Sequence, residues 1–180
     1  MKYLLFCLAF VSLQMYSQDK YLTKTGTVNF EASVPAFEEV KASNNSVTAI
    51  LNTENGNFAA LALVKGFRFK NALMEEHFNE NYAESDSYPK ATFKGSINDF
   101  DADNIEKSKT YTIDGELTFH GKTKKLKQVP VNLFYENGHI KMAGEFETIA
   151  SDFDIKIPKI VSNKIAETIK VDFQFVLSKK

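Results

Sequence analysis

Apolar and polar residues alternate along much of the chain from residue 28 onward. In the first such segment, residues 28–34, the apolar positions are Val28, Phe30, Ala32 and Val34. A period of two gives a β-strand one buried face and one solvent-exposed face. The pattern returns in segments 91–97, 111–119, 129–135, 140–146, 153–157 and 169–177. The sequence therefore predicts an all-β protein.

The dipeptide Asn137-Gly138 gives the clearest turn signal, because it separates two alternating segments. Both residue types accept the positive φ angles of a two-residue hairpin, so these segments are predicted to pair antiparallel. The final segment, 169–177, is long enough to close a sheet on itself. We expect one domain over residues 18–180, an antiparallel β-barrel of about eight strands.

One segment has helical periodicity instead. Its apolar residues share one side of a helix, and Glu75, Glu76, Asn79 and Glu80 fall on the other; the apolar ones are Leu73, Met74, Phe78 and Tyr82. Asn71 is placed to cap a helix that runs from residue 72 to about residue 82. The apolar side needs a surface to cover, and the opening of a barrel provides one. A barrel covered in this way is typical of a ligand container.

The segment from Phe58 to Val64 is apolar at both strand faces. It is either a central strand covered on both sides, or a strand that faces a cavity on one side and a helix or partner on the other. Small residues at inward positions, namely Ala60, Ala62, Gly115 and Gly144, would leave room for a cavity. A close-packed core that alternates large and small residues is the alternative.

The first 17 residues have the pattern of a secretory signal peptide. Lys2 supplies the positive charge, residues 3–13 are apolar but too few to span a bilayer, and Ser17 precedes the predicted cleavage before Gln18. An uncleaved anchor and a lipoprotein signal at Cys7 are the alternatives. Because Cys7 is the only cysteine, the mature chain would hold no thiol. We expect a periplasmic or secreted protein.

The net charge excludes few classes of binding partner, because the numbers of basic and acidic residues are nearly equal, 22 against 23. The one basic cluster, residues 122–127, is predicted to lie in a hairpin connection, where lysines commonly protect a sheet edge from pairing. We therefore expect no nucleic-acid partner. The mature chain has no further apolar stretch long enough for a transmembrane helix.

Catalytic and metal-binding patterns are weak. His77, His120 and His139 show no metal-ligand spacing, and no serine sits in a nucleophile motif. We interpret His120 as a strand-end ring beside a turn, and His77 could face either the barrel opening or the solvent. Asp152 and Asp154 alternate with Phe153 and Ile155, which places them on the outer face of a strand.

The acidic stretch 99–103 resembles the start of a calcium-binding loop, but only the start. Asn104 stands where such a loop needs glycine, and Thr110 stands where it needs a bidentate glutamate. We therefore expect an acidic connection between strands. No catalytic residue, metal site or cofactor is predicted.

Four blocks in the chain resemble the YceI-like family of exported proteins: residues 67–79, 88–95, 115–124 and 151–158. The resemblance implies a lipocalin-like antiparallel β-barrel with an apolar cavity, and a long-chain ligand such as a polyisoprenoid. The chain departs from the family's isoprenoid-binding members at residues 21–30, which lack their tryptophan and Asp-x-x-His-Ser block. It has no tryptophan at all, which is typical of a divergent branch.

The sequence and the resemblance together predict a non-enzymatic protein that binds a polyisoprenoid or fatty-acyl lipid. A ligand-free structural or interaction barrel and a small enzyme are the alternatives. The ligand would enter a cavity lined by Phe30, Phe58, Ala60, Ala62, Phe67, Phe69, Leu73, Met74, Phe78, Tyr82, Phe93, Tyr111, Ile113, Leu117, Phe119 and Phe146.

Overall fold

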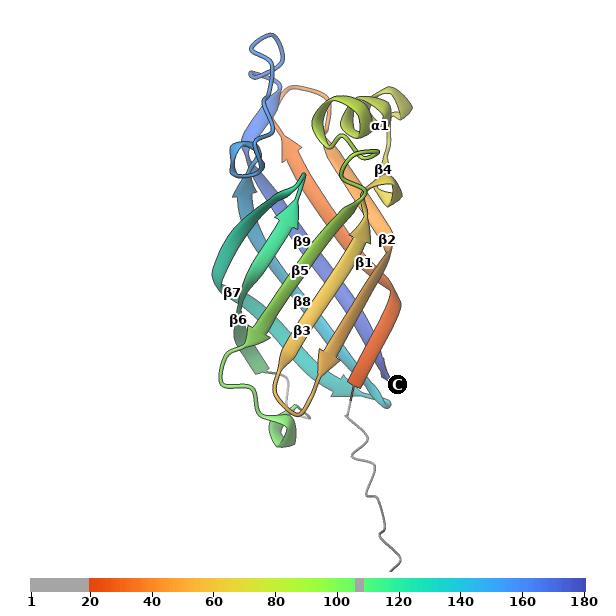
Figure 1. Ribbon diagram of the computed structural model, residues 1–180, viewed down its shortest axis with the longest axis vertical. Helices are drawn as coiled ribbons and strands as arrows, with labels where there is room; N and C mark the ends of the chain where they lie inside the picture. Colours follow the sequence, from red (N-terminus) through yellow and green to blue (C-terminus); the bar gives the residue numbers. More distant parts are fainter. Residues whose placement is uncertain (1–19, 106–108) are drawn as a thin grey trace, which may run out of the picture.

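The computed structural model describes residues 20–105 and 109–180, and within them the chain forms an antiparallel β-barrel (Figure 1). The predicted signal peptide, residues 1–17, lies outside the described residues. The barrel strands are β1 (Lys20–Ser33), β2 (Lys41–Asn52), β3 (Asn57–Leu63), β5 (Lys90–Ile97), β6 (Lys109–Phe119), β7 (Lys122–Glu136), β8 (His139–Ile149) and β9 (Ile165–Lys179).

The sheet closes on itself because the first two strands pair with each other as well as with later strands. The order is β1-β9-β8-β7-β6-β5-β3-β2, and pairing of β1 with β2 closes the ring. A two-residue strand, β4 (Arg68–Phe69), adds to β2 at one end. The predicted eight-stranded antiparallel barrel is confirmed. Closure removes sheet edges, which otherwise invite pairing with other chains.

Connections at opposite ends of the barrel differ in size. We call one end the mouth; it is formed by residues 34–40, 64–89, 120–121 and 150–164. The closed end holds the shorter connections 53–56 and 137–138, the segment 98–105 and both ends of the barrel chain (Figure 1). The predicted hairpin at Asn137-Gly138 is confirmed, with φ angles of 51° and 83°.

The predicted helix is present, and it lies at the mouth (Figure 1). The α-helix α1 (Ala72–His77) continues into a π-helical turn, η2 (Phe78–Tyr82), closed by the bond from Ala83 N to Phe78 O of 2.8 Å. As predicted, Asn71 caps it: its Oδ1 accepts from the N–H groups of Leu73 and Met74. We call α1 and η2 together the lid.

Two predicted local structures are wrong. The basic cluster 122–127 is not a hairpin connection but the first half of β7, in which Leu126 is buried and most of the lysines are exposed. The connection is instead the pair His120 and Gly121, with φ angles of 47° and 71°. A strand with a polar outer face shows few apolar residues, so its start is hard to recognise from alternation.

The segment 153–157 is not a strand either. A short 3₁₀ helix, η4 (Ala150–Phe153), ends at Asp154, which has the left-handed φ of 57°. Asp152 Oδ2 accepts from Ile149 N and thereby caps this turn. Asp152 and Asp154 therefore do not lie on the outer face of a strand, because side-chain capping favours a turn over extended backbone.

The apolar strand β3 faces the barrel interior with Phe58, Ala60 and Ala62. On its other face, Ala59 and Leu61 are half-buried and Leu63 is exposed. No helix of the described chain covers that face, since the lid lies over the mouth. The strand therefore faces a cavity on one side, as the second interpretation states, but no helix of the described residues covers its other side.

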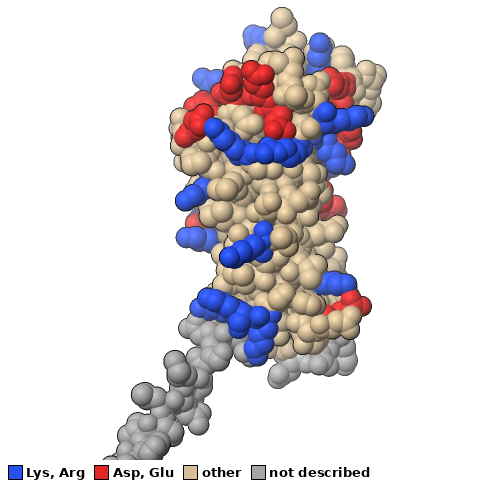
Figure 2. Space-filling model, turned by 90° about the vertical axis from the view of Figure 1, so that its right-hand side faces the viewer, with Lys and Arg blue, Asp and Glu red and all other residues tan. Residues whose placement is uncertain are grey.

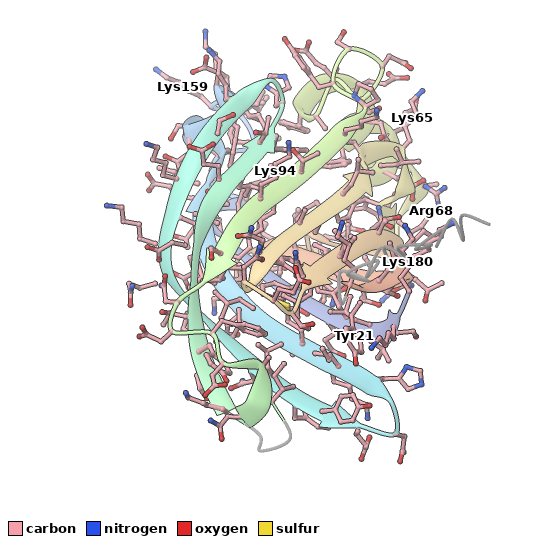
Figure 3. All side chains as sticks on the ribbon, turned by 60° about the horizontal axis from the view of Figure 1, so that its bottom comes forward. Tyr21, Lys65, Arg68, Lys94, Lys159 and Lys180 are labelled. Atoms are coloured by element: carbon pink, nitrogen blue, oxygen red, sulfur yellow. The ribbon has the colours of Figure 1, made fainter. Side chains whose placement is uncertain are left out.

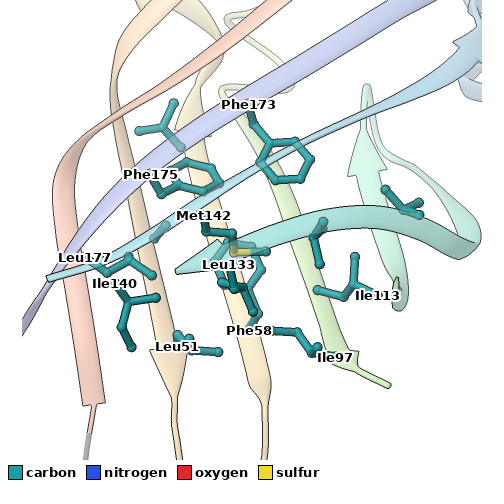
Figure 4. Packing of buried hydrophobic residues seen from close by; sticks show 14 of the residues in the cluster. Leu51, Phe58, Ile97, Ile113, Leu133, Ile140, Met142, Phe173, Phe175 and Leu177 are labelled. Carbon is teal, nitrogen blue, oxygen red and sulfur yellow. The ribbon is translucent and has the colours of Figure 1, made fainter. Parts of the chain in front are cut away.

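The tightest packing lies toward the closed end. Six side chains from five strands meet there and are at most 2% exposed: Leu51, Ile113, Leu133, Ile140, Met142 and Leu177 (Figure 4). Tyr111 lies near this end, with its ring centroid 6.2 Å from that of Phe100. The barrel is thus solid at one end, and its free volume lies between this core and the mouth.

Candidate ligand-binding cavity

The interior of the barrel contains a cavity of about 550 Å³ between the packed core and the mouth. This volume falls in the range of about 300–1,000 Å³ that is typical of small-molecule sites. Nearly all lining residues are apolar. The six polar ones are Glu38, Asn71, His77, Thr92, Thr148 and Lys164. Such a lining suits a molecule with a long apolar part.

Aromatic rings form the deep part of the cavity. Phe58 lies 5.6 Å from Phe175 and 6.2 Å from Phe93 between ring centroids, and Phe173 stacks on Phe175 at 5.5 Å. Figure 4 shows the rings of Phe173 and Phe175 beside Met142. These rings separate the cavity from the aliphatic core below.

The small residues expected to leave room behave in two ways. Ala60 and Ala62 line the cavity. At Gly115, an added Cβ would lie 2.5 Å from Phe93 Cζ, and at Gly144 it would lie 2.6 Å from Phe173 Cζ. The rings of Phe93 and Phe173 therefore fill the space over these glycines, which do not themselves provide cavity volume.

Four phenylalanines gather under the lid. Phe78 of η2 has ring centroids 5.3 Å from Phe30 of β1, 5.2 Å from Phe69 of β4 and 6.1 Å from Phe67. Phe30 also contacts Phe67 at 5.3 Å and Phe69 at 5.7 Å. We call these four residues the mouth cluster. Phe78 is the member of this cluster that belongs to the lid. Its contacts with the other three rings hold the lid over the cavity.

A carboxylate ties the other side of the lid to the barrel. Glu75 Oε1 accepts from Arg68 Nη1 at 2.8 Å, and its Oε2 accepts from the backbone N–H of Phe69 at 3.0 Å. Both donors belong to β4, which extends the sheet beside β2. Glu75, predicted to lie on the helix side opposite the apolar residues, thus joins the lid to a strand.

A polar network connects the β6–β7 turn to η4. Lys124 Nζ donates to Asp152 Oδ2, which also accepts from the hydroxyl of Thr148 at 3.2 Å. Lys122 pairs with Asp154 at 2.7 Å. We call these five residues, with His120, the mouth network. It fixes the base of the β8–β9 connection.

These contacts change the titration of the two aspartates. The hydrogen bond from Lys124 lowers the pKa of Asp152, with further help from Ile149 N and Thr148, and this outweighs desolvation. The hydrogen bond and charge of Lys122 lower the pKa of Asp154. Both groups are therefore bound more tightly as carboxylates than as acids.

The three histidines lie in different surroundings. His77 lines the cavity and is exposed, so it faces both the mouth and solvent. His120 belongs to the β6–β7 turn itself and not to the strand end; its Nδ1 lies 2.9 Å from Phe153 O, and its ring centroid is 4.5 Å from that of Tyr88. His139 Nδ1 lies 3.0 Å from Ser178 Oγ at the closed end.

Metal-ligating side chains do not gather within residues 20–105 and 109–180: no group of three or more was found there. In the acidic stretch 99–103, Asp101 Oδ2 accepts from Asn104 Nδ2 at 2.6 Å. The helices of the same described ranges are all too short or too polar to cross a lipid bilayer.

The structure places fifteen of the sixteen predicted lining residues at the cavity wall. The exception, Tyr111, is buried in the core below. Sequence reasoning missed lining residues on β1, β7, β8 and β9, although the same alternation marks them: Val28, Val129, Met142, Val171, Phe173 and Phe175. It also missed Ile155, Ile157 and Val161, which come from an irregular connection and show no period.

Comparison with solved structures finds the same architecture in several bacterial proteins. A polyisoprenoid binding domain from Saccharophagus degradans has a TM-score of 0.77 at 15% identity, over 91% of this chain and 99% of that one. BcnA from Burkholderia cenocepacia has a TM-score of 0.70 at 17% identity, over 86% and 96%. The YCEI protein of Campylobacter jejuni has a TM-score of 0.63 at 14% identity, over 82% and 88%.

At such low identity these likenesses show a shared fold. A search of the curated proteins found no match. The family model of the YceI-like domain, however, matches residues 19–177, which is almost the whole barrel chain. The chain therefore belongs to the YceI-like family.

Proposed function

We propose that this protein is an exported, non-enzymatic binding protein that holds a long apolar molecule, a polyisoprenoid or another lipid, in its barrel. The observation behind the proposal is the cavity of about 550 Å³, whose lining is mostly apolar and whose deep part is formed by phenylalanines. Burial of apolar groups supplies about 0.8 kcal/mol per methylene, before the cost of ordering the chain is subtracted. The Saccharophagus domain with this fold is described as polyisoprenoid binding.

The polar lining residues suggest which way the ligand lies. All six belong to the mouth half of the barrel: Thr92 is near the start of β5 and Thr148 near the end of β8, and the others belong to mouth connections or the lid. A polar end group would therefore remain at the mouth while the apolar chain extends toward Phe58, Phe173 and Phe175.

The same residues support binding without chemistry. Asn71 Oδ1 is used to cap the lid, and its Nδ2 donates to Glu38 Oε1 at 3.0 Å. Thr148 is bonded to Asp152 and Lys124 in the mouth network. Three of the six polar side chains, those of Glu38, Asn71 and Thr148, are thus held by structural partners, which favours a container over an active site.

Native mass spectrometry of the secreted protein, followed by organic extraction, tests the proposal. We expect an adduct of lipid mass that is lost on extraction. A protein of ligand-free mass that takes up no long-chain lipid of any length would contradict it and favour a filled structural barrel.

Export is part of the proposal and rests on residues 1–17. N-terminal sequencing of the protein recovered outside the cytoplasm is expected to begin at or near Gln18. Recovery of a chain that still begins at Met1 and is embedded in a membrane would contradict export of a free carrier.

A further inference from the structure

The β8–β9 connection combines apolar and basic residues in an unusual way. From Ile155 to Lys164 it contains four aliphatic residues and three lysines, and no acidic residue. The lysines are Lys156, Lys159 and Lys164, and no ion pair with a described carboxylate is found for them. The acidic residue just before this stretch, Asp154, is paired with Lys122.

This connection has two faces. Ile155, Ile157 and Val161 point to the cavity and form part of its wall. Ile160 does not line the cavity and is 84% exposed, the highest exposure of any large apolar residue in the described chain. An isoleucine held in water at the tip of a connection gains free energy when it enters an apolar phase.

The connection also reaches farthest from the barrel. Figure 1 shows it, in blue, as the outermost part of the mouth, and Figure 3 shows Lys159 at the same end. Two other exposed apolar residues lie at this end on separate segments, Phe37 at 44% and Leu73 at 56% exposed. Both also line the cavity. The cavity wall thus continues outward into exposed apolar residues.

We propose that the β8–β9 connection docks the mouth on an anionic lipid bilayer, with Ile160 inserted at the level of the head groups and the lysines in contact with lipid phosphates. An interfacial segment of this kind combines exposed apolar residues with lysines. The inference rests on the proposed function, because docking would let an apolar ligand pass between bilayer and cavity without crossing water.

Charge sets the direction of approach. Around the lid, residues 64–89 contain five acidic residues against three Lys and Arg residues, so an acidic excess remains although Arg68 pairs with Glu75 and Lys65 with Asp86. Figure 2, which views the side of α1 and β4, shows acidic and basic groups together near the mouth. An anionic surface repels the lid and attracts the β8–β9 connection, so the barrel meets the bilayer tilted, with the lid farther away.

The mouth network holds the base of the connection in place for this role. Asp152 is bonded to Lys124, Thr148 and Ile149 N, and His120 contacts Phe153 O. Residues 150–154 are therefore fixed to the barrel, and only the tip beyond them has to change surroundings on docking.

A tryptophan reporter tests docking directly, because the natural chain has no tryptophan. With vesicles rich in phosphatidylglycerol, Ile160→Trp is expected to show a blue-shifted emission that brominated lipids quench. The matched control is Val176→Trp, on β9 toward the closed end, where the side chain is 51% exposed and its emission should not shift. No shift at position 160, or an equal shift at both positions, would overturn the proposal.

The reporter substitution could itself promote insertion, so a second test leaves Ile160 in place. Lys159→Gln is expected to weaken vesicle binding about fivefold, the usual contribution of one lysine near an anionic surface. Lys24→Gln, the same change on the wall of β1, is the control. Binding should weaken with salt and be slight on phosphatidylcholine alone. Equal loss in both variants, or binding that ignores lipid charge, would contradict docking by this connection.

A third measurement separates docking from ligand binding. A pyrene-labelled long-chain fatty acid is delivered either from cyclodextrin or from anionic vesicles. Ile160→Ser should slow uptake from vesicles several-fold and leave equilibrium uptake from cyclodextrin unchanged, since Ile160 is outside the cavity lining. Unchanged uptake from both sources would overturn the docking proposal alone. Failure of the wild type to bind the probe from cyclodextrin would instead count against the proposed function.

Discussion

The ring of Phe175 rests directly on the backbone of Gly26, so that a Cβ atom added there would overlap its Cδ1 and lie 2.7 Å from Cε1. Phe93 and Phe173 cover Gly115 and Gly144 in the same way. Covering a strand glycine with an aromatic ring protects the backbone and supplies apolar contact in place of the missing side chain. These pairs keep the rings flat against the wall and leave the centre of the barrel open.

Gly26→Ala should therefore lower the free energy of unfolding by about 1–3 kcal/mol, because the new methyl group overpacks against Phe175. Chemical denaturation measures the change. The double variant Gly26→Ala with Phe175→Leu should lose less than the sum of the single variants, since leucine vacates part of the contested space. Strict additivity would show that the ring is not the cause.

Asp152 provides a pH test. Its pKa is lowered from the reference of 3.8, first by Lys124, so its contribution to stability is complete above that value and disappears as the pH falls through the lower folded-state pKa. We expect Asp152→Asn to cost about 1 kcal/mol at neutral pH. The difference from the wild type should vanish in acid. A difference that persists below the folded-state pKa would contradict a charge-dependent role.

Among the elements, the lid depends on two kinds of contact, and each can be removed separately. Phe78 enters the mouth cluster from above, and Glu75 bonds to β4 from the side. The π-helical turn at η2 adds a residue to the helical turn just where Phe78 and Tyr82 face the cavity. Such turns occur often at functional sites.

Phe78→Asp should greatly reduce retention of the pyrene-labelled lipid, because it buries a charge among three phenyl rings. Glu80→Lys, an exposed change on the same turn, is the control and should retain the lipid. Circular dichroism must show that both variants keep the β-sheet signal. Wild-type retention by a folded Phe78→Asp protein would show that the lid does not guard the cavity.

Glu75→Gln tests the second contact. One of the two donors on β4 loses its acceptor and the other keeps only an uncharged one. We therefore expect stability to fall by about 1 kcal/mol and hydrogen exchange in α1 to speed up. Glu76→Gln, an exposed neighbour on the same helix, should change neither. If the two variants behave alike, the bonds to Arg68 and Phe69 do not fix the lid.

The elements also show what sequence can and cannot predict here. Alternation and the asparagine cap identified most of the strands and the lid, because both signals are local. Alternation assigns residues to the inner face of the barrel. It does not show how far along the barrel axis they lie, because that position depends on strand tilt and stagger. Tyr111 therefore fell in the core while Phe173 and Phe175 were overlooked. The turn at Asp152 is held partly by Lys124, which comes from another hairpin and which no local pattern shows.

At the scale of the molecule, a barrel with one solid end and one open end limits ligand length. Affinity should rise about fourfold with each methylene added to a saturated fatty acid, then level off when the cavity of about 550 Å³ is filled. Competition with the pyrene-labelled probe measures the series. Equal affinity for short and long chains would contradict deep burial of the tail.

Both ends of the barrel chain meet at the closed end, where Lys180 N donates to Lys20 O at 2.9 Å. A short linker could join them, and the chain could be reopened at the mouth, for example between residues 34 and 40, with every barrel strand kept. Equally, a fusion partner or a solid support attached at either terminus would leave the mouth unobstructed. The fold thus suits immobilised lipid sensors in which the opening faces the sample.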